Sequence, residues 1–279
     1  MTANRFGFPG PAEPSVPGDL KILALGDAFT SAEGVDTEAA WPRLVERQLG
    51  QPATIWNGAV TGYGPDQYAA VATELAPLLD PDVVVVGFFV NDFSDAGASI
   101  EDAREAIGFG KPDPTGLVPT LEWEHLAGYL GYHLTEPALA VLGIPNHTGY
   151  FLANFEALEP GSVDFTQYQA ALTAMGEVRA AAPNARLVMM LIPASVQVCD
   201  PQALNYYPAN IDPAEFDYEQ PQRLAAALAA EIGAEVLDLR PALRAAPGCP
   251  YQPGNMHWLE EGHQIAAAAL IRHLSGAAA

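Results

Sequence analysis

Four short polar stretches, each placed after an apolar run, hold the residues that could do chemistry. They are Gly26-Asp-Ala-Phe-Thr30, Asn57-Gly-Ala-Val-Thr-Gly-Tyr-Gly64, Gly87-Phe-Phe-Val-Asn-Asp92, and Asn255-Met-His-Trp258 with Gly262-His263. Together they offer an imidazole, an amide and glycine-rich backbone, which are groups that serve as base and as hydrogen-bond donors in acyl transfer. Taken singly, each has a structural explanation; Asn91 and Asp92, for example, could cap a helix.

The first stretch also contains the position where a nucleophile is expected. Ile22 to Leu25 are apolar and predict a buried strand, Gly26-Asp27 turns the chain, and residues 37–50 predict a helix. A strand, a tight turn and a helix place residue 28 at the carboxyl end of a strand, where open α/β sheets bind ligands. Residue 28 is alanine, which has no hydroxyl with which to attack a carbonyl.

The elements that must position these stretches alternate between strands and helices. The pattern predicts strands at 21–26, 53–57, 81–87, 186–192 and 235–239, and helices at 37–50, 66–79, 166–182, 214–232 and 260–274. The consecutive valines of the third strand indicate burial on both faces, as in a central parallel strand. The alternation predicts a three-layer α/β/α sandwich with a flavodoxin-like, five-stranded parallel sheet.

Two segments fall outside this alternation in what we expect to be a single domain over residues 1–279. Residues 1–20 are rich in proline and predict an extended N-terminal arm. Residues 93–165 follow the third strand, and we expect them to form a cap-like insertion over the carboxyl edge of the sheet. The histidines of this insertion lack the i, i+3 or i, i+4 spacing common in metal sites, so we expect no metal; they are His125, His133 and His147.

Charge and hydropathy restrict the partners. Acidic residues outnumber basic ones 34 to 12, which gives a formal charge of -22. Such a surface repels phosphate backbones, so we expect no nucleic-acid partner. No apolar run reaches the roughly 18 residues that suggest a membrane span.

Two features of the sequence bear on the cellular compartment. The N-terminus lacks the basic, apolar and small-residue order of a signal peptide, although a leader could have been trimmed from the chain. Cys199 and Cys249 both lie in proline-containing loops. They could form one disulfide in an exported protein, or they could be two unrelated thiols.

In this order and spacing, the four stretches resemble the SGNH (GDSL-like) hydrolase superfamily. The blocks of that family are Gly-Asp-Ser, a loop glycine, Gly-x-Asn-Asp and a late Asp-x-(x-)His. The neighbouring sequence resembles the family as well. The matching segments are Gly-Val-Asp-Thr-Glu-Ala-Ala-Trp-Pro42, Asn57-Gly-Ala-Val-Thr-Gly-Tyr-Gly-Pro-Asp-Gln67 and Leu237-Asp-Leu239. The resemblance implies a cofactor-free ester hydrolase or O-acyltransferase whose partner is a small-molecule ester or an acylated glycan.

The resemblance implies a role for five positions. Residue 28 would be the serine nucleophile and would also give its backbone N–H to the oxyanion hole. The backbone N–H of Gly62 and the side-chain amide of Asn91 would be the other donors. His257 would be the general base, and residue 255 would be the acid that orients it.

Two of these positions depart from the family pattern. Ala28 cannot form an acyl-enzyme, although its backbone N–H is retained. Asn255 can accept a hydrogen bond from His257 but brings no charge, and the same change in a serine protease costs about four orders of magnitude in turnover. We therefore expect the chain to be inactive or severely impaired in ordinary acyl transfer.

Three explanations fit these departures. Ala28 could have been introduced into a working Ser–His enzyme, the chain could be a natural pseudoenzyme that binds an ester or a glycan, or another nucleophile could substitute. For the third explanation, Thr30 and Ser31 are close in sequence, but we expect their hydroxyls to point elsewhere, as polar caps for the following segment.

For the other polar residues near these stretches, we expect mainly structural roles. We expect Asp27 to brace the turn, Asp92 to cap a helix and His263 to be structural. Glu260 and Glu261 are candidates for a substitute acid, although negative charge in the first turn of a helix also suits the helix dipole.

Overall fold

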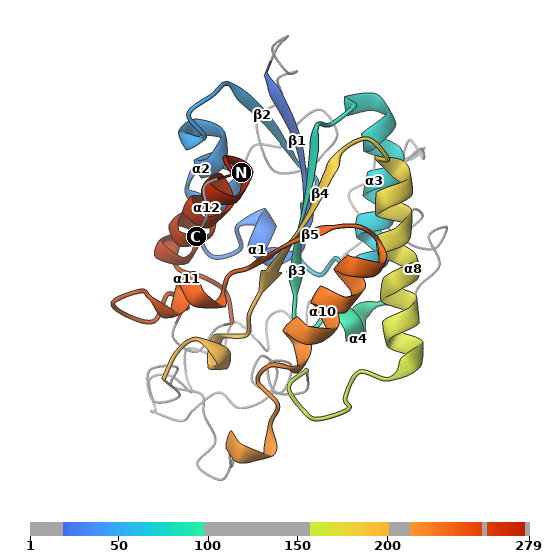
Figure 1. Ribbon diagram of the computed structural model, residues 1–279. Coiled ribbons are helices and arrows are strands. Elements are labelled where there is room, and N and C mark those ends of the chain that lie inside the picture. Colours follow the sequence, from blue (N-terminus) through green and yellow to red (C-terminus); the bar gives the residue numbers. More distant parts are fainter. Residues whose placement is uncertain (1–18, 98–156, 201–212, 253–255, 277–279) are drawn as a thin grey trace, which may run out of the picture.

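Five parallel strands form one sheet in the computed structural model, which describes residues 19–97, 157–200, 213–252 and 256–276 (Figure 1). The strand order is β2-β1-β3-β4-β5, and every neighbouring pair is parallel. The strands are β1 (Leu20–Gly26), β2 (Ala53–Asn57), β3 (Val83–Phe89), β4 (Arg186–Ile192) and β5 (Glu235–Asp238). This order confirms the predicted flavodoxin-like sheet.

Helices cover both faces of the sheet, which confirms the predicted sandwich. Helices α2 (Trp41–Gln48), α11 (Arg240–Arg244) and α12 (Glu260–Leu274) lie on one face, and α3 (Pro65–Leu79), α8 (Phe165–Ala181) and α10 (Gln220–Glu231) lie on the other (Figure 1). The shorter helical segments are α1 (Ala28–Ser31), η1 (Thr37–Ala39), α4 (Asp92–Asp95), η2 (Ser195–Gln197) and η3 (Pro213–Glu215). Among the described helices, none combines the length and apolar character needed to cross a membrane.

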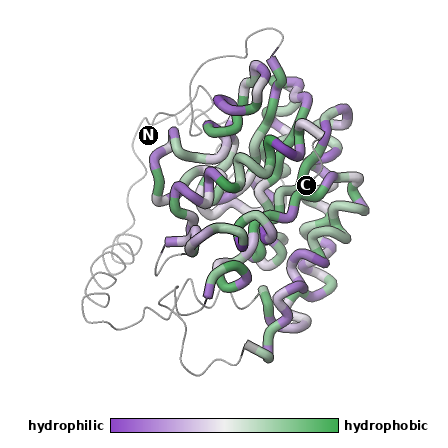
Figure 2. The backbone as a smooth tube through the Cα atoms, turned by 60° about the vertical axis from the view of Figure 1, so that its left-hand side comes forward, coloured by the Kyte–Doolittle hydropathy of each residue, from purple (hydrophilic) through white to green (hydrophobic). Residues whose placement is uncertain are grey.

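The valines of β3 explain why the core has two halves. Val83 and Val85 pack in the core beneath α2 and α12, whereas Val84 and Val86 pack in the core beneath α3 and α8. Successive side chains of a strand point to opposite faces, so one apolar run contributes to both cores. Figure 2 shows hydrophobic stretches running through the centre of the described part.

Prolines account for two differences between predicted and observed helix starts. The predicted helix 37–50 is a 3₁₀ turn followed by α2, in which Pro42 lies in the first turn. The predicted helix 214–232 begins only at Gln220, with Pro221 in its first turn. Proline lacks a backbone N–H and is accepted only where no such donor is needed, so each helix starts just before its proline.

Two short helices and one strand start also differ from the sequence prediction. Helix α11 occupies part of the predicted loop 240–256, and α1 directly follows the predicted turn; both are too short to show helical periodicity. Strand β1 begins at Leu20, the last residue of the predicted arm. Residues 1–18 of that arm and residues 98–156 of the predicted insertion lie outside the described residues.

Thr30 packs where two strands of the sheet come close to α1. Its neighbours Gly26 and Gly87 are paired in register on β1 and β3. A Cβ atom on Gly87 would lie only 2.5 Å from Thr30 Oγ1. Thr30 is fully buried, so the expectation that it serves as a polar cap is wrong.

We predict that Gly87→Ala destabilises the fold by about 1–3 kcal/mol, the usual cost of forcing an extra methyl into a packed site. The clash is with Thr30 Oγ1, so the cost should largely disappear in a Thr30→Ala background and persist in a Thr30→Val background, which keeps the volume. Urea unfolding of the single and double variants measures this coupling. An equal cost in all three backgrounds would contradict the packing explanation.

Candidate functional site

The turn between β1 and α1 places residue 28 at the carboxyl edge of the sheet, where the sequence predicts it. Asp27 is the N-cap of α1, and its carboxylate accepts a hydrogen bond from Phe29 N at 3.0 Å. Ala28, 5% exposed, is the first residue of the helix. This confirms the expectation that Asp27 braces the turn. Burial raises the pKa of the Asp27 carboxyl group to about 7, although the hydrogen bond from Phe29 lowers the pKa.

His257 reaches the same edge on a short antiparallel hairpin, formed by residues 250–252 and 256–259. Gln252 N donates to His257 O at 2.9 Å, and Leu259 N donates to Pro250 O at 2.9 Å. Asn255, the predicted acid position, lies outside the described residues.

Aromatic packing and a disulfide hold the hairpin in place. The ring of Phe29 lies 5.3 Å from that of His257 and 4.9 Å from that of Trp258, centroid to centroid. A disulfide joins Cys199, after β4, to Cys249, immediately before the hairpin, which decides between the two alternatives for these cysteines. The imidazole is therefore fixed against the helix that carries Ala28.

The loop after β2 forms a tight turn at the predicted donor Gly62. Tyr63 N donates to Val60 O at 3.1 Å, and Gly62 has a φ of +83°. A positive φ at the third position of a β-turn is the conformation that glycine adopts without strain. Ser31 Oγ lies 3.3 Å from Thr61 Oγ1, so this turn contacts the end of α1.

Asn91 follows β3 and is held by a neighbouring carboxylate. Its Nδ2 donates to Asp95 Oδ2 at 2.8 Å, and its side chain makes no capping bond to α4. A primary amide carries two N–H groups. Asp95 therefore engages one of them and orients the other.

Asp92 lies beneath the site rather than at a helix cap, so the capping interpretation is wrong for this residue as well. Its carboxyl group is fully buried and accepts a hydrogen bond from Phe89 N at 3.0 Å. The Tyr68 hydroxyl lies 3.1 Å from both Asp92 Oδ1 and the carbonyl oxygen of Tyr63.

The surroundings of Asp92 favour its protonated form. A tyrosine hydroxyl has one hydrogen, and the Tyr63 carbonyl can only accept. Both contacts are hydrogen bonds if Tyr68 donates to Tyr63 and the neutral acid of Asp92 donates to Tyr68. Burial, reinforced by the charges of Asp27 and Asp95, raises the pKa of Asp92 well above its usual value in the same direction.

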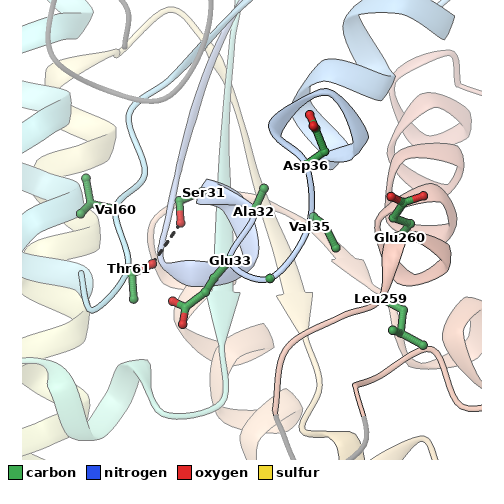
Figure 3. A pocket seen from close by; sticks show the side chains of 10 residues that line it. Ser31, Ala32, Glu33, Val35, Asp36, Val60, Thr61, Leu259 and Glu260 are labelled. Carbon is green, nitrogen blue, oxygen red and sulfur yellow. Dashed lines mark hydrogen bonds between the residues drawn. The ribbon is translucent and has the colours of Figure 1, made fainter. Parts of the chain in front are cut away.

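A pocket of about 720 Å³ opens beside these residues, between the end of α1, the Val60–Thr61 turn and the start of α12 (Figure 3). Ser31 and Glu33 come from the first of these segments, and Leu259 and Glu260 from the last. Ser31 is the buried last residue of α1, and its Oγ contacts Ala28 O and Thr61 Oγ1 rather than the following segment, so its expected role as a cap is wrong. Ala28, Gly62, Asn91 and His257 are not among the residues that line the pocket.

Glu33 is a candidate functional residue that the sequence analysis missed. Ala32 takes a left-handed conformation and ends α1, and Glu33 directly follows this bend on the pocket wall. Burial lowers the pKa of His257, and the negative charge of Glu33 opposes that shift. The sequence analysis missed Glu33 because it did not predict α1, a single helical turn that decides where residue 33 lies.

The other expected residues take their predicted places. His263 is 1% exposed on α12, and its Nδ1 accepts from Trp41 N at 3.4 Å, which requires a neutral ring. Burial lowers the pKa of His263 to about 4, with a smaller contribution from His257. This confirms the structural role of His263. Glu260 and Glu261 lie in the first turn of α12, as expected.

The family model for the GDSL-like Lipase/Acylhydrolase family matches residues 24–265. The chain belongs to this family. Among solved structures, this GDSL-like chain resembles TesA with a TM-score of 0.53 and 14% identity, over 92% of this chain and 99% of that one. It also resembles the lipase/acylhydrolase from Enterococcus faecalis, with a TM-score of 0.51 and 13% identity over 92% and 95% of the two chains. No curated protein sequence matches it significantly.

We predict that Asp92→Asn flattens the pH dependence of this GDSL-like fold. A carboxyl group whose pKa is raised on folding adds to the free energy of unfolding. This contribution is complete below about pH 4, the pKa of the group in the unfolded chain, and is lost as the pH rises through the folded pKa. Asp27 therefore loses its contribution between about pH 4 and its folded pKa of about 7, and Asp92 loses its own from about pH 4 up to its raised folded pKa. The amide introduced by the substitution reproduces the neutral acid, so the variant should lose less stability between pH 5 and pH 9.

Urea unfolding at pH 5, 7 and 9 measures this difference, which amounts to at most about 1.4 kcal/mol per pH unit for one proton. Asp80→Asn is the matched control, because the side chain of Asp80 is 94% exposed. An Asp92→Asn slope equal to that of the parent chain would show that Asp92 is already ionised.

We further predict that Glu33→Gln lowers the pKa of His257. The substitution removes the charge that favours the imidazolium and leaves burial, which disfavours it. Ring-proton NMR titration, with the signal assigned by loss in His257→Ala, measures the shift. Glu177→Gln makes the same charge change at an exposed position of α8 and should leave this pKa in place; an equal shift in both variants would exclude a local effect of Glu33.

Proposed function

We propose that this GDSL-like chain keeps the ester-binding site of a small O-acyl hydrolase but does not form an acyl-enzyme at residue 28. Ala28 occupies the nucleophile position at the carboxyl end of β1. The single observation that carries the proposal is this alanine at that position, beside the His257 hairpin. An esterase that works through an acyl-enzyme needs an oxygen or sulfur at this point, and alanine supplies neither.

The remaining roles follow the family pattern and complete the proposal. His257 is the general base, held largely neutral by burial, which is the state that accepts a proton. Gly62 N–H, Ala28 N–H and the second N–H of the Asn91 amide are the oxyanion donors. The hydrogen bond from Asn91 to Asp95 supports this role, because it fixes the amide without consuming both of its hydrogens.

The same residues allow a derivation of the missing step. A serine hydroxyl at position 28 would lose its proton to His257 as its oxygen attacked the ester carbonyl, and the three donors would stabilise the resulting oxyanion. Each such donor contributes about 3–4 kcal/mol to lowering the barrier. In the proposal, Asn255 occupies the acid position and supplies no charge to stabilise the imidazolium.

A second function is a binding protein for an ester or an acylated glycan in the same site. The observation that favours it is the pocket beside Ser31 and Thr61, which does not depend on a nucleophile at residue 28. In this case, the donors and the pocket recognise the ligand, and the alanine leaves it intact.

The test is hydrolysis of p-nitrophenyl acetate by the chain as it stands, by Ala28→Ser, and by Ala28→Ser with Asn255→Asp. We expect background rates for the first, measurable turnover for the second, and a gain of up to about 10⁴-fold for the third, the factor seen for a triad acid. His257→Ala in the Ala28→Ser background should remove the gain. Stoichiometric labelling of the serine variants by a phosphonate ester provides a readout independent of turnover.

The folded state of each variant is checked by its unfolding midpoint. Folded serine variants that neither turn over nor become labelled would overturn the esterase site. Turnover by the unsubstituted chain that survives His257→Ala would also contradict the proposed roles.

A further inference from the structure

The pocket beside the candidate site has two chemically different walls. Figure 3 shows Ser31, Glu33, Val60 and Thr61 on one side and Val35, Leu259 and Glu260 on the other. The first wall gathers oxygen atoms around the end of α1, and the second places the apolar side chains of Val35 and Leu259 beside the carboxylates of Asp36 and Glu260. A ligand that fits both walls must combine a polar head with a short apolar segment.

The polar wall carries three side chains whose oxygen atoms can accept hydrogen bonds, namely Glu33, Ser31 and Thr61. Glu33 Oε2 is buried and has no hydrogen-bond partner within the part of the chain that the structure describes. Ser31 Oγ and Thr61 Oγ1 lie 3.3 Å from each other on the same wall. Of the described residues that line the pocket, none is lysine or arginine, while Glu33, Asp36 and Glu260 are acidic.

A buried carboxylate oxygen without a partner is costly, and a donor that reaches it recovers that cost. The ligand head is therefore a donor and positively charged, because a carboxylate or phosphate would meet Glu33 and Glu260 with the same sign of charge. A hydroxyl oxygen has two lone pairs and can accept even while it donates elsewhere. The wall thus offers three acceptor atoms to one head group.

We propose that this pocket binds a primary ammonium group carried on a short alkyl chain, with the ammonium at Glu33, Ser31 and Thr61 and the chain along Val35, Val60 and Leu259. A primary ammonium has three N–H donors, which match the three acceptors. Quaternary ammonium ligands are usually held by aromatic faces, and the described lining of this pocket contains no aromatic side chain. The inference deepens the proposed function, on which its biological meaning rests: the ester recognised next to Ala28 carries a primary amine.

The test uses hexylammonium as the probe and the unsubstituted chain, titrated by saturation-transfer NMR at about 0.15 M salt, where long-range attraction to the acidic surface is screened. Hexanol, hexanoate and hexyltrimethylammonium are matched probes that remove the charge, invert it, or remove the N–H donors. We expect hexylammonium to bind at least about tenfold more tightly than each of them, the difference that one charged hydrogen bond makes.

Variants of the polar wall locate the binding. Glu33→Gln should weaken hexylammonium about tenfold, and Thr61→Val, an isosteric change at an exposed residue, should weaken it by about two- to threefold. Glu177→Gln controls for the change in net charge and should have no effect. Bound hexylammonium should also lower the pKa of His257, as Glu33→Gln does, because it offsets the same negative charge.

The outcomes separate this inference from the proposed function. Equal binding of hexyltrimethylammonium, or equal weakening by Glu33→Gln and Glu177→Gln, overturns the ammonium site. Binding of methyl glucoside with no binding of hexylammonium makes the pocket a sugar site and also overturns it. If hexylammonium binds through Glu33 while the folded serine variants show no turnover or labelling, the esterase proposal fails and the ammonium site stands. If the serine variants turn over and hexylammonium does not bind through Glu33, only the ammonium site is overturned.

Discussion

The packing of Phe29 is the interaction on which the rest of the site depends. Its ring lies 4.7 Å from that of Phe89 at the end of β3 and also contacts Tyr251, His257 and Trp258 of the hairpin. An aromatic ring buries a large apolar area and prefers tilted or edge contacts such as these. Because Phe29 directly follows Ala28, one buried ring fixes Ala28, the end of the central strand and the imidazole of His257 relative to one another.

The burial that aligns these groups also sets their charges. Asp27, Asp92, His257 and His263 are all buried close to the carboxyl edge. Loss of solvent disfavours the charged form of every one of them, so carboxyl pKa values rise and imidazole pKa values fall. Burial therefore shifts all four groups toward their neutral forms, and the Tyr68 hydroxyl lies 3.1 Å from the Asp92 carboxyl group.

The acidic side chains of the pocket wall differ from these buried groups. Glu33 lies at the boundary between the buried cluster and the pocket, so its charge acts on His257 from one side and on any ligand from the other. Alanine at residue 28 offers no nucleophilic side-chain atom, and residue 28 is not part of the pocket wall. In the proposed function, ligand recognition and acyl transfer are thus separable, since the pocket wall and residue 28 belong to different residues of one short segment.

The sequence by itself determined the sheet, its flanking helices and the placement of residue 28, because alternating apolar periodicity and turn residues are local signals. Proline positions could have refined the starts of α2 and α10, since the rule they follow is also local. Tertiary structure alone decided that Cys199 and Cys249 are bridged, that Asp92 contacts Tyr68, that Thr30 fills the space above Gly87, and that the charge of Glu33 acts on His257. Each of these depends on the distance between segments remote in sequence or on a single helical turn, and neither leaves a periodic pattern in the chain.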